Sequence, residues 1–158
     1  MLSPSVPELS LRTETNDGCV TAVVEFIGFF GDGTPTSEQW GKYRRIEVGF
    51  ENVLYARLFP EFSTEDQERI DGYDWSAVPE FRDEKGGFAG SVERSRAAWS
   101  ETMVCPSPSS YSVLGSDLVR KLGLNDAEFM HFLFLGDDFN VEVIAKDWTW
   151  CATGEALS

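Results

Sequence analysis

The sequence predicts an α+β fold: a mainly antiparallel, curved β-sheet or open barrel of about seven strands, with about two short helices. Apolar residues recur at every second position in several stretches, and Asn, Asp and Gly turn signals separate these stretches. The helical patterns are short and do not alternate regularly with strands. The 158 residues fit a single domain, 1–158, in which residues 1–7 are expected to form a flexible N-terminal tail.

A β-hairpin is predicted first, between Glu8 and Gly31. Its turn is Asn16-Asp17-Gly18, residue types that tolerate positive φ. Alternate residues of the second strand place apolar side chains on one face: Val20, Ala22, Val24, Phe26 and Phe30. The other face is partly apolar as well, so this strand is expected to be central and covered on both sides.

A second hairpin is predicted after a loop that reaches to about Gly41. Its first strand alternates around Arg44, Ile46, Val48 and Phe50. Glu51-Asn52 is the expected tight turn, and 53–59 is the returning strand. Pro60 ends that strand because proline has no N–H to donate to the sheet.

Two short helices follow, separated by a long weak pattern. The first begins with the cap and early acids of Ser63 to Glu68 and ends before Gly72. Residues 73–97 are expected to be an exposed connection, and 98–104 a strand. The second helix spans about 116–122, with Ser116 as N-cap and Gly123 at the C′ position.

The C-terminal third allows two interpretations of residues 129–135. Asn125 with Glu128 resembles a capping box, which indicates a helix. A strand is preferred, because the alternating stretch 139–145 needs an antiparallel neighbour and 136–138 can form the turn. The segment Trp148 to Trp150 is expected to extend that return strand.

The net charge of −14 is the most unusual property of the composition. It repels phosphate backbones and anionic lipid headgroups, so nucleic-acid and membrane partners are disfavoured. It attracts a basic protein partner and speeds the encounter at low salt. The competing interpretation is that the charge serves solubility alone.

The sequence contains no pattern typical of a metal site, a disulfide framework or a cofactor site. The three cysteines, Cys19, Cys105 and Cys151, have neither redox nor metal-site spacing, and His131 is the only histidine. We therefore predict no metal and no cofactor. The N-terminus shows no signal-peptide pattern, and a cytoplasmic location is expected.

The sequence offers residues for two catalytic arrangements, and neither is predicted. His131 could form a dyad with Cys105 or Cys151, but a packed strand position explains it better. Glu25 and Glu142 could form an acid–base pair if burial separated their pKa values. Strand alternation instead predicts that both carboxylates face solvent, and no catalytic residue is predicted.

The strongest nonrandom feature is the segment from Glu61 to Glu84, with nine acids against two arginines. Aromatic rings lie between the acids, an arrangement typical of protein-binding surfaces. The predicted contact residues are Glu65, Asp66, Glu68, Asp71, Tyr73, Asp74 and Trp75. Alternatively, these rings pin a solvated loop onto the sheet.

These observations lead to one expected function and two alternatives. We expect a non-enzymatic protein-binding domain for a basic protein, working as small acidic inhibitors and immunity-type proteins do. The first alternative is a small-ligand carrier or enzyme with an aromatic-lined cavity bounded by 20–30 and 139–145. The second is a homo-oligomeric subunit whose contact is a sheet edge or the pair Trp148 and Trp150.

Overall fold

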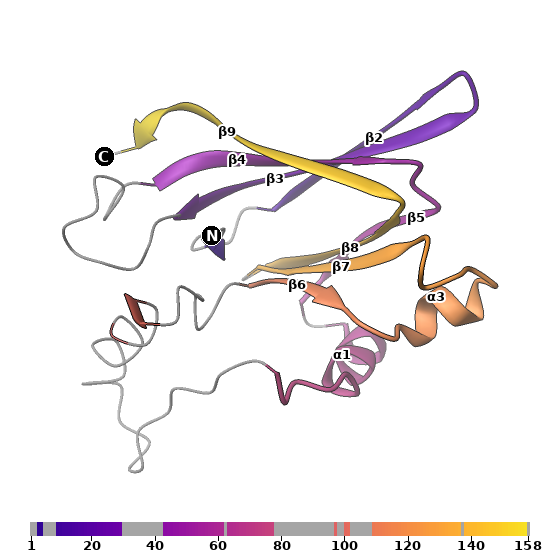
Figure 1. Ribbon diagram of the computed structural model, residues 1–158. Helices are drawn as coiled ribbons and strands as arrows, with labels where there is room; N and C mark the ends of the chain where they lie inside the picture. The colour runs from indigo at the N-terminus through magenta and orange to yellow at the C-terminus, as the bar shows by residue number, and fades with distance from the viewer. Residues whose placement is uncertain are drawn as a thin grey trace, which may run out of the picture.

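The protein consists of two antiparallel β-sheets, one above the other, with two short helices beneath the lower sheet (Figure 1). The computed structural model describes residues 3–4, 9–29, 43–61, 63–77, 97, 100–101, 109–136 and 138–157. We call the five-stranded sheet A and the four-stranded sheet B. The α+β class and the antiparallel sheets are as predicted, and the sheets do not close into a barrel.

Sheet A contains the predicted first hairpin, with its second strand at the centre of the sheet and its first strand at the edge. The order is β1-β3-β4-β9, and β2 also pairs with β3, on the side of β1. The turn uses the expected positive φ at Asp17 and Gly18. The strands are β1 (Ser3–Pro4), β2 (Ser10–Asn16), β3 (Cys19–Phe29), β4 (Tyr43–Glu51) and β9 (Asp147–Leu157).

Sheet B has the order β5-β8-β7-β6. Its central hairpin, β7 with β8, confirms the strand interpretation of residues 129–135, with Leu135 opposite Asn140 at the turn. The helical alternative is therefore wrong. The strands are β5 (Tyr55–Pro60), β6 (Ser110–Val113), β7 (Met130–Leu135) and β8 (Phe139–Ala145).

The predicted second hairpin is wrong, because β4 and β5 lie in different sheets. Asn52 adopts a positive φ of 53° and turns the chain away from sheet A. The next two amides bond to both sheets: Val53 N donates to Val20 O and Leu54 N to Ile144 O, each at 2.9 Å. Val53 is buried in the core, so this crossing segment is packed and cannot act as an exposed hairpin turn.

The C-terminal strand makes the same kind of crossing. Trp148 and Trp150 do not extend β8, because the chain leaves sheet B after β8 and β9 pairs with β4 in sheet A, with Trp148 opposite Phe50.

The strand β3 is central in sheet A but is not covered on both faces. Its core side is buried, whereas Val23 and Ile27 on its outer side are only half-buried.

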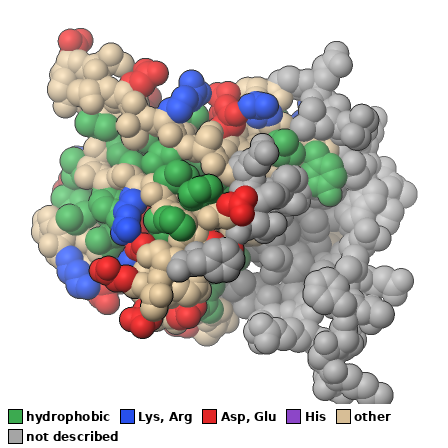
Figure 2. All heavy atoms as spheres, turned by 180° about the vertical axis from the view of Figure 1, so that it is seen from behind, with side chains coloured by type: hydrophobic (Ala, Val, Ile, Leu, Met, Phe, Trp, Pro, Cys, Tyr) green, Lys and Arg blue, Asp and Glu red, His purple; other side chains and the backbone are tan. Residues whose placement is uncertain are grey.

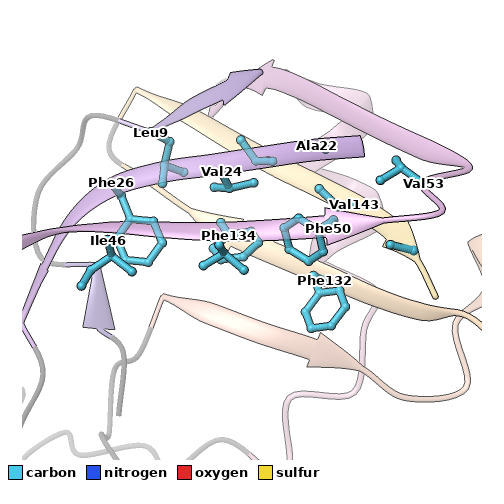
Figure 3. Close-up of a cluster of buried hydrophobic side chains, with 13 residues drawn as sticks. Leu9, Ala22, Val24, Phe26, Ile46, Phe50, Val53, Phe132, Phe134 and Val143 are labelled. Carbon is cyan, nitrogen blue, oxygen red and sulfur yellow. The ribbon is translucent and has the colours of Figure 1, made fainter. Parts of the chain in front are cut away.

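Apolar side chains from the facing sides of the two sheets fill the space between them (Figure 3). Val24 and Phe26 of β3 point toward β7 and β8, where Phe134 and Val143 meet them. Phe50 lies 5.0 Å from Phe132 and 6.2 Å from Phe134, measured between ring centroids. The interior that could have formed a ligand cavity is thus occupied by core side chains.

Two helices, α1 (Thr64–Asp71) and α3 (Asp117–Lys121), cover sheet B from below (Figure 1). α3 has the predicted ends: the Ser116 hydroxyl accepts from Val119 N, and Gly123 has φ +70°. Gly123 N and Leu124 N donate to Arg120 O and Val119 O, which completes a Schellman motif. Neither helix is long and apolar enough to cross a bilayer.

Three further predictions can be compared with the described residues. Ser100 and Glu101 are helical, so the strand expected over 98–104 is wrong at these positions, and its other residues lie outside the described ranges. Ser3 and Pro4, expected in a flexible tail, pair with Phe29 and Gly28 instead. The connection over 73–97 is described only at 73–77 and at 97.

Candidate functional site

The outer face of sheet B carries an unusual group of buried polar side chains under α1 and α3. Strand alternation places His131 and Leu133 of β7 and Glu142 of β8 on this face. Ile70 of α1 packs there with Phe59 and Leu133 in a small apolar cluster. We call the polar group around Glu142 the buried network.

Glu142 is the centre of the buried network and is fully buried. Its Oε1 accepts hydrogen bonds from Arg69 Nη1 and from the Tyr73 hydroxyl, the latter at 3.2 Å. His131 Nε2 lies 3.4 Å from the same oxygen. The other oxygen, Oε2, is buried and has no hydrogen-bond partner in the described part of the chain.

His131 links Glu142 to the start of α3. Its Nδ1 lies 2.8 Å from the Ser116 hydroxyl, which also accepts from Val119 N at 3.2 Å. Because Nε2 faces the Glu142 carboxylate, the favourable neutral tautomer carries its proton on Nε2. In that tautomer Nδ1 accepts from the Ser116 hydroxyl.

Asp66 forms the second half of the buried network and is 2% exposed. Arg57 binds it through both terminal nitrogens at 2.8 and 2.9 Å, and the Ser63 hydroxyl donates to it at 2.7 Å. Arg69 reaches Asp66 at 3.0 Å with one nitrogen and Glu142 with the other. A single guanidinium group therefore joins the two buried carboxylates and fixes α1 on sheet B.

The pKa values follow from burial and from these hydrogen bonds. Burial alone would raise the pKa of Glu142, but the neighbouring His131 ring and the Arg69 guanidinium outweigh burial and hold it below its ordinary value of 4.5. Burial opposes the charge of Asp66 in the same way, and Ser63 and Arg69 lower its pKa below 3.8. Burial and the Glu142 charge raise the pKa of Tyr73 to about 12.

Ser116, His131 and Glu142 follow the hydroxyl–imidazole–carboxylate order of a nucleophilic triad. Their exposed fractions are only 2%, 1% and 0%. No substrate atom can reach the serine oxygen through such a sealed face, and that oxygen already caps α3. The arrangement is therefore a structural relay that joins α3, β7, β8 and α1.

The catalytic pairs weighed from the sequence are not assembled. Glu25 lies on the outer face of sheet A, on the far side of the core from Glu142, and forms a surface ion pair with Arg45. The prediction that Glu142 faces solvent is wrong, because α1 covers it; the same prediction for Glu25 holds. Cys151 is exposed on sheet A, far from His131, and Cys105 lies outside the described residues.

The sequence contained one signal for the buried network. The turn predicted from the sequence at 136–138 implies a register for the two strands, and in the structure His131 pairs with Ile144 and Leu133 with Glu142. His131 and Glu142 must then share a face as diagonal neighbours. The roles of Arg57 and Arg69 had no such signal, because they depend on where α1 and β5 pack.

The predicted contact residues divide between the two sides of α1. Glu65, Glu68 and Asp71 are exposed on the outer side, and Asp74 follows them, also exposed. We call these four acids the acidic face. Carboxylate groups gather along the lower part of the described surface in Figure 2, the level at which α1 lies in Figure 1.

The other three predicted contact residues are engaged inside the protein. Asp66 is buried in the network and cannot contact a partner. Tyr73 is half-buried against Glu142 and Arg69. Trp75 donates to Ile70 O at 2.9 Å and packs edge-on against Tyr111, so it fixes the segment after α1 to the protein.

Within the described ranges, no three His, Cys, Asp or Glu side chains are grouped closely enough to bind a metal ion. The site is thus an acidic helix whose inner side is held by buried ion pairs. No protein-family model, no curated protein and no solved structure matches this chain.

Proposed function

We propose that this protein is a non-enzymatic binding domain whose acidic face, Glu65, Glu68, Asp71 and Asp74, meets a basic protein partner. The supporting observation is that the buried and the exposed acids of α1 differ in their partners. The inner carboxylate, Asp66, is paired with Arg57 and Arg69, whereas Glu65 and Glu68 form no ion pair with any described residue. Asp71 and Asp74 accept local hydrogen bonds, from Gln67 and from Ser76 N, so all four acids keep their charge on the outer surface.

The buried network makes this face a rigid one. Arg69 holds α1 through two carboxylates, and Ile70 anchors it in the apolar cluster. A partner that binds the acidic face does not have to order the helix first, so little conformational entropy opposes binding. The net charge of −14 adds long-range attraction for a basic protein, which salt screens.

Two charge variants of equal net charge separate a specific face from the general field. The first neutralises the acidic face; the second neutralises four exposed acids on other elements and is the matched control. The substitutions are Glu65→Gln, Glu68→Gln, Asp71→Gln and Asp74→Asn in the first variant, and Glu14→Gln, Glu51→Gln, Asp126→Asn and Asp147→Asn in the second.

Both variants and the wild type are immobilised, exposed to lysate of the source organism at low salt, and eluted with a salt gradient. A basic protein retained by the wild type and the control, but bound at least about tenfold more weakly by the acidic-face variant, would support the proposal. Equal retention by the two variants would show that only net charge acts, and would overturn it.

The ligand-cavity alternative receives less support from the fold. The inward side chains expected to line a cavity pack against the opposite sheet and are almost fully buried; in the described ranges they include Ala22, Val24, Phe26, Val141, Val143 and Ala145. The alternative of self-association has a specific observation in its favour, the exposed tryptophans of β9, and is taken up below.

A further inference from the structure

Each sheet has two edges, and three of the four edges are protected against pairing with another chain. β6 has only 4 residues, and β5 has 6 residues, carries Arg57 and ends on Pro60. The edge formed by β1 and β2 contains Pro4 and the exposed charges of Arg12 and Glu14. Short length, proline and charge are the usual protections of an edge strand.

The fourth edge, β9, is long and contains no proline, and its two charged residues, Asp147 and Glu155, lie outside its central residues 148–154. It is 11 residues long, and in the described part of the chain it pairs with β4 on one side only. Residues 148–154, Trp-Thr-Trp-Cys-Ala-Thr-Gly, contain no charge and no proline. We call these residues the open edge segment. Unpaired backbone groups along such a strand are a template for another strand.

The side chains of the open edge segment add apolar surface. Trp148 and Trp150 pair with Phe50 and Val48 and so lie on the core side of sheet A. Both are 43% exposed, although Trp148 contacts Phe132 at 5.5 Å between ring centroids. Half-exposed indoles on an edge strand are typical of an interface.

We propose that the open edge segment pairs in antiparallel fashion with the same segment of a second copy of this chain. Such pairing joins the two copies of sheet A into one continuous sheet about a two-fold axis. The indoles of both copies then cover each other between the two copies of sheet B.

A second copy fits this edge better than a charged partner does. The absence of charge over 148–154 gives no means of selecting a basic protein, which the acidic face attracts instead. It also keeps like charges apart within the paired segment, although Asp147 of each copy then faces Glu155 of the other at its ends, and each copy has a net charge of −14. Repulsion between the whole molecules remains, so the dimer should be strengthened by salt, whereas binding at the acidic face should be weakened.

A lysine on the edge provides the test. Cys151 is exposed and lies opposite Glu47, so Cys151→Lys adds an edge charge that the monomer tolerates as a cross-strand ion pair. Ser10→Lys is the matched control, because Ser10 is exposed on the edge strand β2 and lies opposite Glu25. Both changes make the chain less negative, which by itself would favour association.

Sedimentation equilibrium with a thiol reductant, from micromolar to submillimolar protein, measures the dimer at about 50 mM and about 500 mM salt. We expect a wild-type dimer that tightens with salt, a Cys151→Lys dissociation constant at least about tenfold higher, and no change for Ser10→Lys. A monomer throughout both series, or equal effects of the two lysines, would overturn the proposal.

Hydrogen exchange locates the contact without any substitution. The dimer should slow exchange of the amides over 148–154 as the protein concentration rises, and leave those of β2 unchanged. Protection that grows elsewhere but not in the open edge segment would overturn the assignment. The acidic-face variant should dimerise like the wild type, so failure of either proposal leaves the other testable.

Discussion

The outer faces of the two sheets differ in what covers them. On sheet A, Glu25 pairs with Arg45 at the surface, with side-chain exposures of 22% and 56%. On sheet B, α1 and α3 lie over Glu142 and His131 and reduce their exposure to 0% and 1%. Both glutamates occupy alternating positions in apolar strands, and the sequence around them looks alike.

The difference shows that a carboxylate in a strand takes its chemistry from the layer packed on it. Glu25 keeps its hydration and needs little from Arg45, since exposed ion pairs contribute little to stability. Glu142 has lost its water and depends on Arg69, Tyr73 and His131. Removing one member of a buried pair leaves the other uncompensated, which is costly.

The largest expected effect comes from replacing the two glutamates separately. Glu142→Gln should lower the free energy of unfolding by about 3 kcal/mol, because Arg69 then keeps a buried charge with one carboxylate fewer. Glu25→Gln should lower it by less than about 1 kcal/mol. Urea unfolding of both variants measures the difference, with the slope m checked for constancy. Similar losses for the two variants would mean that the covered and open faces are energetically alike.

The dependence of the free energy of unfolding on acid pH tests the same difference between the buried and the exposed carboxylates. Glu142 and Asp66 have folded-state pKa values below their ordinary ones, so the unfolded state binds more protons in acid. Stability should therefore be fully present above about pH 5 and should fall as the pH drops through the folded-state values. Glu142→Gln and Asp66→Asn should each flatten this fall, and the double variant most. Unfolding curves measured at several acid pH values would contradict this if all four proteins showed the same slope.

The smallest effect is expected at Tyr73. Tyr73→Phe removes a hydroxyl that bonds to Glu142 and Arg69, and should cost less than about 1.5 kcal/mol at neutral pH. The raised pKa gives it a distinct alkaline signature: the unfolded phenol ionises near 10.0 and the folded one at about 12, so wild-type stability falls as pH rises across that interval. The variant should lose less stability there, as measured by urea unfolding at alkaline pH. An identical alkaline profile would show that Tyr73 is not sealed by α1.

Local signals predicted the elements that are stabilised locally. The Asn16-Asp17-Gly18 turn, the Ser116 cap with Gly123, and the hairpin of β7 with β8 place their partners within a few residues, and all three appear in the structure. Ser63 begins α1 as expected, but its hydroxyl bonds to Asp66 and makes no cap bond to the backbone. The cap position was predictable, whereas its bond depends on where Arg57 brings Asp66.

Strand partners further away could not be predicted in the same way. Residues 44–51 and 55–60 both have strand patterns, and a hairpin was the nearest way to pair them. The structure instead pairs β4 with β9, about a hundred residues away, and β5 with β8, about eighty residues away. The burial of Val53 between the sheets stabilises this crossing, and no local sequence pattern predicts that burial.

The sequence by itself determined the α+β class, the two hairpins closed by local turns, the positions of both helices and the strongly acidic charge. These depend on side-chain period, turn geometry and capping, which act within a few residues. The tertiary structure alone decided which glutamate is buried, which acids of α1 point outward and which strand edge stays open. Burial and strand pairing are set by contacts between distant segments, and only the folded chain brings those segments together.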